Sequence, residues 1–293
     1  MRRVGIVAKA RLERAASHLA QIASWLEERN LAPVFDPDSA ALARSAGANG
    51  RLEVVERDEL PRHVDFIVVL GGDGTLLGTA GRIAQANADI PILGVNFGSL
   101  GFLTEVTLPE IYASLETAVN GTAQIEERMM LQVAVNAGGA QLAGRIVLND
   151  VVVTQGALSR IIELSVSVDG EFMMRVKADG LIIASPTGST AYNLSAGGPI
   201  VHPQVDGLTI TPIAPHTLTN RPVVVPGSSH IRVQPLIHDD QSEVFATFDG
   251  QALLPLRSDH VVTVRRAQKP LRLIRASARG YFQVLREKLK WGG

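Results

Sequence analysis

The sequence contains no cysteine, and aromatic residues make up only 4% of its 293 positions. The lack of cysteine excludes disulfides, thiolate nucleophiles and cysteine-ligated metal ions from this chain. Hydrophobic residues still make up 46% of the sequence, so its core must be built mainly from aliphatic side chains.

Charge bias and long apolar runs are also missing. The formal net charge is −1, which argues against nucleic acid as a general partner, because such binding depends on neutralising phosphates with Lys and Arg. No apolar stretch approaches the length that spans a membrane. The apolar run Val4–Ala8 after the first two arginines is too short for a signal peptide and indicates a first strand. We therefore expect a cytoplasmic protein with no membrane partner.

The first part of the chain alternates between strand and helix patterns, and its length favours two domains. Strand-like runs lie at Val4–Ala8, Ala32–Phe35, Val64–Leu70 and Ile90–Asn96, with helix-like segments between them. This order indicates βαβ units and a parallel sheet. We predict a Rossmann-like α/β domain over residues 1–125.

Beyond about residue 125 the pattern changes to short apolar or alternating runs typical of an antiparallel β sandwich. The dipeptides Asp169-Gly170 and Asp249-Gly250 are hairpin turn signals. We predict an all-β domain over residues 126–275, and a helix at about 276–293 that packs back on the first domain. The expected strands are Met129–Val135, Ala143–Val153, Ile161–Val168, Phe172–Val176, Leu181–Ala184, Ile231–Pro235, Val244–Phe248 and His260–Arg265.

The turn Gly71-Gly72-Asp73-Gly74-Thr75 follows a buried strand and precedes a helix-like segment. Glycines let the backbone approach a ligand closely, and a helix N-terminus attracts phosphate. A carboxylate at such a site repels phosphate unless it holds a metal ion or accepts a proton, so Asp73 indicates phosphoryl transfer. The alternative is that Asp73 is only a helix N-cap.

A second polar stretch, Ser185–Ser195, directly follows the apolar run Leu181–Ala184. Its hydroxyl groups suit the neutral hydrogen-bonding edges of a nucleobase or ribose, and Tyr192 offers a flat face for stacking. The alternative is a solvated loop with a Ser or Thr cap. Asn149-Asp150 is another polar pair between strand-like runs, a pattern more often typical of a turn.

These segments together resemble the NAD kinase family in its bacterial form. The resemblance also covers Asn96–Leu103, Pro215–Leu218 and Asp249–Gln251, so it runs in order over most of the chain. The glycine turn is shared with phosphofructokinases and with diacylglycerol and sphingosine kinases, whereas the Thr187–Tyr192 block is far more specific to the family.

The resemblance implies an α/β domain of the phosphofructokinase and diacylglycerol kinase type, followed by a β-sandwich domain that binds NAD. It also implies a homodimer or homotetramer in which a neighbouring subunit borders the nucleotide site. Asp73 is the residue that it assigns to activating the acceptor hydroxyl. The phosphate-binding residues that it implies are Gly71, Gly72, Gly74 and Thr75.

The residues that the resemblance implies for NAD form a longer set. Asn149 and Asp150 would hold the adenosine part, and Lys177 and Gln251 match positions of variable residue type. The others are Gly72, Gly74, Arg160, Asp179, Thr187, Thr190, Ala191, Tyr192, Ser195 and Ala214. No Walker-type lysine follows the glycine turn, so charge for a triphosphate must come from Mg²⁺ and from basic residues elsewhere, for which Arg128, Arg160, Arg175 and Arg221 are candidates.

The predicted function is that of an NAD kinase, which uses ATP and a divalent cation, Mg²⁺, to phosphorylate the 2′-hydroxyl of the adenosine ribose of NAD. ATP is favoured over polyphosphate, because the basic residues are scattered rather than aligned along a track. A lipid kinase or a sugar-phosphate kinase with the same turn is the alternative, and an NAD-binding sensor module is the non-enzyme alternative. The sugar kinase is disfavoured because no Lys or Arg occurs between Asp179 and Arg221.

Overall fold

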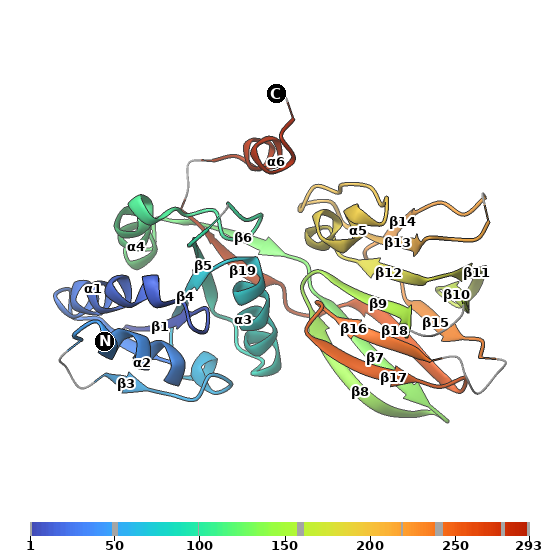
Figure 1. The fold of residues 1–293 in the computed structure, drawn as a ribbon, viewed down its shortest axis with the longest axis horizontal. Helices are drawn as coiled ribbons and strands as arrows, with labels where there is room; N and C mark the ends of the chain where they lie inside the picture. The colour runs from blue at the N-terminus through green and yellow to red at the C-terminus, as the bar shows by residue number, and fades with distance from the viewer. Residues whose placement is uncertain are drawn as a thin grey trace. The chain divides into compact units, whose positions relative to one another are not determined.

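The computed structural model describes residues 2–48, 52–98, 100–156, 161–217, 219–237, 243–276 and 279–291. The chain divides into two compact units (Figure 1). Unit 1 consists of Met1–Glu127 together with Leu271–Gly293, and unit 2 consists of Arg128–Pro270.

Unit 1 is built around a seven-stranded sheet with the order β3-β2-β1-β4-β5-β19-β6. Strands β3, β2, β1, β4, β5 and β19 pair in parallel, which confirms the predicted parallel sheet. The strands are β1 (Arg3–Ala8), β2 (Ala32–Phe35), β3 (Glu53–Val54), β4 (Phe66–Gly71), β5 (Pro91–Asn96), β6 (Gln124–Arg128) and β19 (Leu271–Arg275).

Helices connect the strands of unit 1, except α6, which follows the last strand, and each helix buries side chains on one face. In α1, Leu19, Ile22 and Leu26 recur at helical spacing and are fully buried. At the start of α2, the side chain of Asp36 accepts a hydrogen bond from Ser39 N–H at 3.1 Å. The helices are α1 (Ala16–Glu27), α2 (Pro37–Ser45), α3 (Asp73–Gln85), α4 (Ile111–Val119) and α6 (Tyr281–Leu289), with 3₁₀ turns at Glu13–Ala15, Leu60–Arg62 and Leu108–Glu110.

Strand β19 belongs to unit 1, although the sequence placed residues up to 275 in the second domain. Arg272 and Leu273 pair in parallel with Pro91 and Ile92 of β5. A short apolar strand carries no sign of which sheet it joins, because its partner is distant in sequence. The chain therefore returns to the first sheet before α6 begins.

Unit 2 is a pair of six-stranded sheets, with the orders β11-β10-β15-β18-β7-β8 and β14-β13-β12-β9-β16-β17. Within the described residues these strands pair in antiparallel fashion, which confirms the predicted β sandwich. The strands are β7 (Leu131–Ala137), β8 (Ala140–Val147), β9 (Asp150–Gln155), β10 (Ile162–Val168), β11 (Glu171–Ala178), β12 (Gly180–Ala184), β13 (Gly207–Ile213), β14 (Val223–Pro226), β15 (Ile231–Pro235), β16 (Val244–Phe248), β17 (Ala252–Leu256) and β18 (His260–Arg266).

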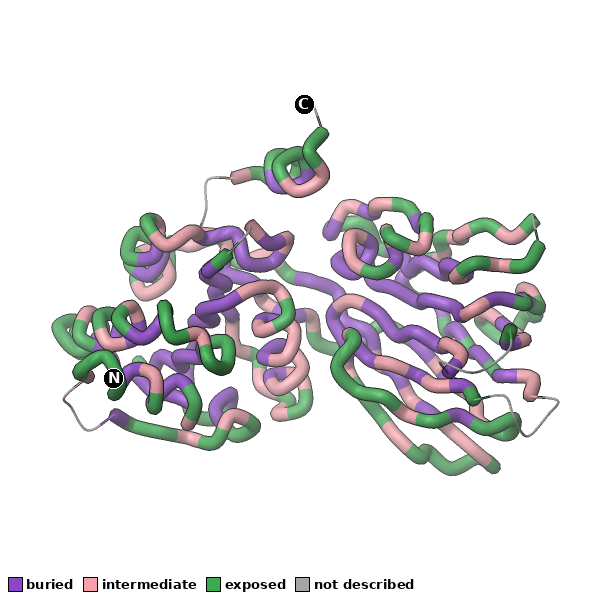
Figure 2. Tube along the Cα trace, viewed as in Figure 1, coloured by how far each residue is buried: buried purple, intermediate pink, exposed green. Residues whose placement is uncertain are grey.

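Side chains from both sheets of unit 2 form its core, which is almost wholly aliphatic. Figure 2 shows buried residues concentrated along the strands of each unit. Unit 2 also contains the 3₁₀ turn Thr187–Thr190 and the short helix α5 (Tyr192–Ser195).

Both Asp-Gly hairpins form as the sequence predicts. Asp169 and Asp249 have φ values of 53° and 50°, and Gly170 and Gly250 also have positive φ. Two successive residues of positive φ match the twist of a tight hairpin. The turns join β10 to β11 and β16 to β17.

The apolar run Ala143–Val153 is not one strand, as its pattern suggested. It contains the end of β8 and most of β9, which lie in different sheets. The break falls at Leu148–Asn149, where the chain crosses between the sheets. The polar Asn149-Asp150 pair lies at this break, but a turn-like pair does not show that the next strand joins another sheet.

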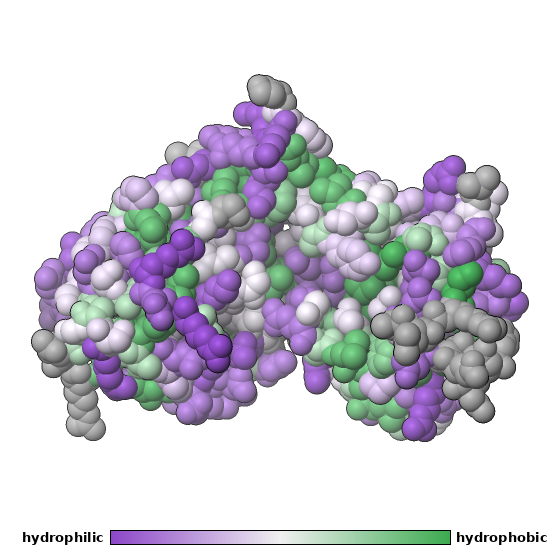
Figure 3. Space-filling model, viewed as in Figure 1, coloured by the Kyte–Doolittle hydropathy of each residue, from purple (hydrophilic) through white to green (hydrophobic). Residues whose placement is uncertain are grey.

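In the described part of the chain, no helix is long and apolar enough to cross a membrane. Figure 3 shows hydrophilic and apolar residues interspersed over the visible face of each unit. The most exposed large apolar side chains, Phe172, Leu253 and Phe282, lie on three different elements.

Candidate functional site

The glycine turn joins a buried strand to a helix, as predicted. Strand β4 ends at Gly71, Gly72 is the N-cap residue of α3, and Asp73 is the first helical residue. The alternative interpretation of Asp73 as the N-cap is therefore wrong. The turn lies at the carboxyl end of a parallel strand, where open α/β sheets usually bind ligands.

Gly72 and Gly74 leave open space at the start of α3. A Cβ atom on either residue would meet no heavy atom within 4 Å, and neither residue has a positive φ. The fold itself therefore does not require glycine at these two positions, whereas close approach of a phosphate to this backbone would favour it. Gly71 differs, because its Cβ would lie 2.7 Å from the hydroxyl of Thr75.

The Asp73 carboxylate is fixed by the loop that follows β5. Its Oδ2 accepts a hydrogen bond from Phe102 N–H at 2.8 Å. Its Oδ1 accepts from Leu103 N–H at 3.2 Å, Thr104 N–H at 3.0 Å and the Thr104 hydroxyl at 2.9 Å. Three donors therefore occupy Oδ1, and Oδ2 retains the capacity to accept from a ligand hydroxyl.

The loop beneath Asp73 is itself closed by side-chain contacts. Asn96, at the end of β5, donates to the Thr104 hydroxyl at 3.2 Å and accepts from Gly98 N–H at 2.6 Å. A Cβ atom on Gly101 would lie 2.0 Å from Asp73 Oδ1, so only glycine fits there. The family resemblance covers part of this loop, but the sequence gave no indication that the loop forms hydrogen bonds to Asp73.

In unit 2, the Asn149–Asp150 pair lies beside the start of the hydroxyl-rich segment. Ser185 donates its N–H to the Asn149 carbonyl at 2.9 Å and its hydroxyl to the Leu148 carbonyl at 2.5 Å. Gly188 packs so closely that a Cβ would lie 2.1 Å from the Asn149 carbonyl oxygen. The structure therefore brings together two motifs that are distant in sequence.

The carboxylate of Asp150 is buried, with 4% of the residue exposed. Burial, together with the negative charge of Asp249, raises the pKa of Asp150 to about 7. Within the described residues, no hydrogen bond reaches this carboxylate. A buried carboxylate that accepts no hydrogen bonds lowers the stability of the folded protein. Such a group is a strong candidate for binding ligand hydroxyls.

The segment after β12 presents further groups for a ligand. The Thr187 hydroxyl is buried and has no hydrogen-bond partner in the part of the chain that the structure describes. Tyr192 is 48% exposed, so its ring is open for stacking. Thr190 and Ala191 are half-buried and Ser195 is exposed.

Asn193 organises this segment, although the sequence did not single it out. It is fully buried, and its amide donates to the carbonyls of Ser189 and Pro199, both at 3.1 Å. Its oxygen accepts from the hydroxyls of Thr209 at 3.2 Å and Thr211 at 2.6 Å. A run of polar residues does not show in advance which of them faces inward.

A second group of predicted residues lies at the opposite end of β12. Asp179 accepts from the Gln155 amide at 3.0 Å, and its N–H donates to the Ile213 carbonyl at 3.0 Å. The next residue, Ala214, is exposed and has a φ of 45°, which is strained for a residue with a Cβ. Because β12 spans five residues, this group lies on the order of 20 Å from Ser185.

The remaining predicted residues are more scattered. Lys177 is exposed and lies 3.8 Å from a Glu163 oxygen, and Arg175 lies 3.5 Å from the same side chain. Arg128 is buried and Arg221 is exposed. Gln251 lies in the turn after β16 and is exposed. The remaining candidate, Arg160, is outside the described residues.

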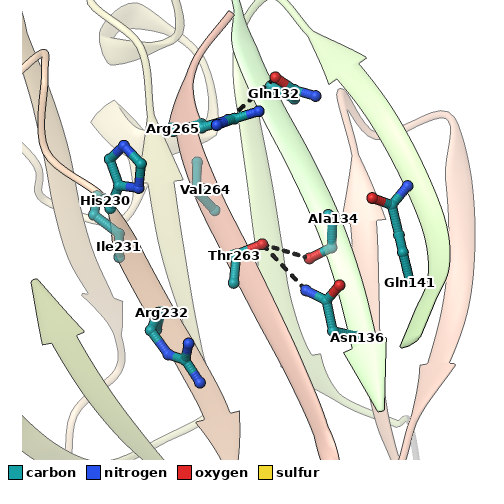
Figure 4. A pocket seen from close by; sticks show the side chains of 10 residues that line it. All are labelled: Gln132, Ala134, Asn136, Gln141, His230, Ile231, Arg232, Thr263, Val264 and Arg265. Carbon is teal, nitrogen blue, oxygen red and sulfur yellow. Dashed lines mark hydrogen bonds between the residues drawn. The ribbon is translucent and has the colours of Figure 1, made fainter. Parts of the chain in front are cut away.

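A pocket of about 290 Å³ lies on one sheet of unit 2 and contains none of the predicted binding residues (Figure 4). Its polar side chains largely bond to neighbouring strands. The Thr263 hydroxyl donates to the Ala134 carbonyl at 3.2 Å and accepts from the Asn136 amide at 3.3 Å. Arg265 donates to the Gln132 amide oxygen at 3.2 Å. These contacts account for the side chains of Gln132, Asn136, Thr263 and Arg265 as cross-strand bonding.

A glycine turn at the end of a parallel strand, a fixed carboxylate beside it and a hydroxyl-rich segment in a β sandwich define a nucleotide-dependent kinase. Residues 4–123 match the family model described as the ATP-NAD kinase N-terminal domain. Residues 148–276 match the model of the ATP-NAD kinase C-terminal domain. The chain belongs to the NAD kinase family.

Relatives support this assignment over the whole length. The chain is 46% identical to the NAD kinase of Geotalea daltonii and 48% identical to that of Geobacter sulfurreducens, and in both cases the match covers 100% of this chain and 99% of the relative. These matches confirm the predicted family and its enzymatic class.

Solved structures are similar as well. The NAD kinase from Archaeoglobus fulgidus in complex with ATP matches with a TM-score of 0.74 and 26% identity, over 99% of this chain and 100% of that one. Yeast NADH kinase complexed with NADH has the same fold, with a TM-score of 0.88 and 24% identity, over 100% of this chain and 88% of that one.

Proposed function

We propose that this chain transfers the γ-phosphoryl group of ATP to the 2′-hydroxyl of the adenosine ribose of NAD, which gives NADP. The observation that carries the proposal is the Asp73 carboxylate, held by four hydrogen bonds beside Gly72 and Gly74, where a Cβ atom would meet no heavy atom within 4 Å. The names of its relatives support NAD as the acceptor, and the ATP complex of the Archaeoglobus fulgidus enzyme supports ATP as the donor.

In this proposal, Asp73 orients the acceptor hydroxyl and takes its proton late in the reaction. A carboxylate of ordinary pKa, near 4, cannot deprotonate an alcohol in the ground state. Once the bond to phosphorus has begun to form, the hydroxyl is acidic enough to release its proton to Asp73. Gly71, Gly72, Gly74 and Thr75 would lie against the phosphates.

The two groups of residues at opposite ends of β12 suit a ligand with a base at each end. We assign Asn149 and Asp150 to the adenosine part of NAD. The other predicted contacts are Thr187, Thr190, Ala191, Tyr192, Ser195, Asp179, Ala214, Lys177 and Gln251. A dinucleotide can use both groups within one subunit or across two, and the latter agrees with the homodimer or homotetramer that we propose.

Magnesium fits this arrangement as part of the donor. In the described residues, no three His, Asp or Glu side chains are grouped where they could hold a metal ion. Mg²⁺ needs few protein ligands when it is bound to nucleotide phosphates, where it neutralises charge. The protein's own part is then to place Asp73 and the glycine backbone.

A panel of acceptors tests the proposed function. The purified chain is incubated with ATP and Mg²⁺ and with NAD, NADH, diacylglycerol in mixed micelles or fructose 6-phosphate. We expect NADP formation from NAD and no phosphorylated lipid or sugar. A second series replaces ATP by polyphosphate, which we expect to be the poorer donor. Phosphorylation of the lipid or sugar without formation of NADP would contradict the proposal.

A further inference from the structure

The turn between β16 and β17 supplies a carboxylate to the backbone of the Asn149–Asp150 pair. Asp249 Oδ2 accepts from Leu148 N–H at 2.9 Å. Asp249 Oδ1 accepts from the N–H groups of Asn149 at 2.8 Å and Asp150 at 3.1 Å. In return, the N–H of Asp249 donates to the Asp150 carbonyl at 3.0 Å. Three successive peptide units are therefore held by one side chain.

These three N–H groups lie where the chain crosses from β8 in one sheet to β9 in the other. Leu148 and Asn149 lie between the two strands, and their N–H groups bond to Asp249 in place of a strand partner, whereas Asp150 begins β9 and pairs with Ala184 of β12. Successive N–H groups directed at one anion form a nest, which a charged acceptor stabilises more strongly than a neutral one. The Asp249 carboxylate therefore helps to fix this backbone through its N–H groups, while Ser185 bonds to the carbonyls of Leu148 and Asn149.

The turn conformation does not itself require aspartate at position 249. Its φ of 50° is one that Asn and Gly adopt at least as readily, and Asn-Gly is a preferred hairpin sequence. Aspartate also carries a cost there, because its charge lies near the buried Asp150 and raises the pKa of that residue. A residue that is costly and not needed for the turn is best explained by its bonds to residues 148–150.

We propose that Asp249 is a positioning residue for NAD binding, which acts through the backbone of Asn149 and Asp150. This inference depends on the proposed function, in which that pair holds the adenosine part of NAD. Asp249 needs no contact with the substrate in this role. Its loss is expected to weaken the affinity for NAD and to leave the glycine turn of unit 1, and with it the use of ATP, largely unchanged.

The test replaces Asp249 by Asn, which keeps the turn but removes a charged acceptor. We expect the KM for NAD to rise roughly 10- to 100-fold, which corresponds to the loss of one or two charge-assisted hydrogen bonds. The KM for ATP and kcat are expected to change by less than about threefold, since a positioning role affects ground-state binding of NAD. Calorimetric titration with NADP provides a readout that does not depend on turnover.

The second Asp-Gly hairpin provides a matched control. Asp169 has the same turn conformation and accepts a hydrogen bond from His230 N–H at 2.7 Å, but it bonds to no predicted binding residue. We expect Asp169→Asn to leave the KM for NAD unchanged. Asp249→Glu, which retains the charge, is expected to recover part of the affinity. If Asp249→Asn is recovered unfolded, Asp249→Gly, which also suits the positive φ of the turn and removes the carboxylate, carries the same test.

The outcomes separate the inference from the function on which it depends. If the wild-type chain neither binds NADP nor forms it, the proposed function fails. If the wild type does both and Asp249→Asn binds NADP equally well, the positioning role alone is refuted. Equal losses in the use of NAD and ATP, or an equal effect of Asp169→Asn, would also refute it.

Discussion

Asp73→Asn is expected to lower the kcat of NADP formation by roughly 10²- to 10⁴-fold, the range typical of a lost proton acceptor. Asparagine has nearly the same shape, and its amide oxygen can still accept from Leu103 and Thr104. Its NH₂ group would face the N–H of Phe102, where the carboxylate now accepts at 2.8 Å. It cannot take a proton from the acceptor hydroxyl. Initial rates and equilibrium binding of NAD are the measurements, and binding is expected to stay within about threefold of the wild type.

Thr104→Val is the matched control for Asp73→Asn. It removes the hydroxyl donor at 2.9 Å from Asp73 Oδ1 but leaves the carboxylate and the backbone donors in place. Loss of one of the four hydrogen bonds that hold the Asp73 carboxylate is expected to lower kcat by roughly tenfold or less. Near-normal turnover of Asp73→Asn, or an equal loss in Thr104→Val, would contradict the role of Asp73 in the reaction.

Asp150→Asn is expected to stabilise the protein at pH 8 in the absence of nucleotide, and to weaken NAD binding. Burial and the nearby Asp249 raise the pKa of Asp150 from 3.8 to about 7 in the folded protein. Between these two values the folded state keeps a proton that the unfolded state has lost. Ionisation of this group therefore lowers the free energy of unfolding as the pH rises from about 4 to about 7. The full decrease persists above pH 7.

From the size of this pKa shift, the ionised Asp150 lowers the free energy of unfolding at pH 8 by on the order of 4 kcal/mol. Asparagine cannot ionise, so the melting temperature of Asp150→Asn is expected to exceed that of the wild type at pH 8, and the difference should vanish near pH 4. Asp206→Asn, which changes an exposed carboxylate of the same unit, is the control and should show no such trend. A variant that is less stable than the wild type at pH 8 would contradict the conclusion that the ionised Asp150 destabilises the folded protein.

Stability and binding are expected to change in opposite directions in Asp150→Asn. A buried carboxylate without protein donors is costly in the free protein, and hydroxyl groups of a bound ribose would supply the missing donors. Placing an acid there is therefore unfavourable for the fold and favourable for the ligand. Groups that destabilise the fold but serve function are common at binding sites.

The sequence predicted the local features of the fold because each of them depends on neighbouring residues. The turn after Val64–Leu70 and the two Asp-Gly hairpins were predicted in this way. Features that depend on distant partners were missed. Strand β19 joins β5 across most of the chain without a local signal. The run Ala143–Val153 divides at the turn-like Asn149-Asp150 pair, but that pair does not show that the next strand joins another sheet.

The same distinction applies to the candidate site. Asp73 stood out because an acid among glycines is unusual, but its donors at Phe102, Leu103 and Thr104 are mostly backbone groups, which no side-chain pattern reveals. Asn193 looked like one polar residue among several until its burial was known. Side-chain identity thus indicated the chemistry of the site, and its supporting contacts required the structure.

Identification of the product that the wild-type chain forms from NAD, ATP and Mg²⁺ is the decisive measurement of its activity. Chromatography, mass spectrometry and ³¹P NMR are used to identify the product and to measure the ADP released. We expect one new phosphomonoester on the 2′-oxygen of the adenosine ribose, identical to authentic NADP, with ADP formed in equal amount. A phosphate on another hydroxyl, or hydrolysis of ATP without phosphorylation of NAD, would contradict it.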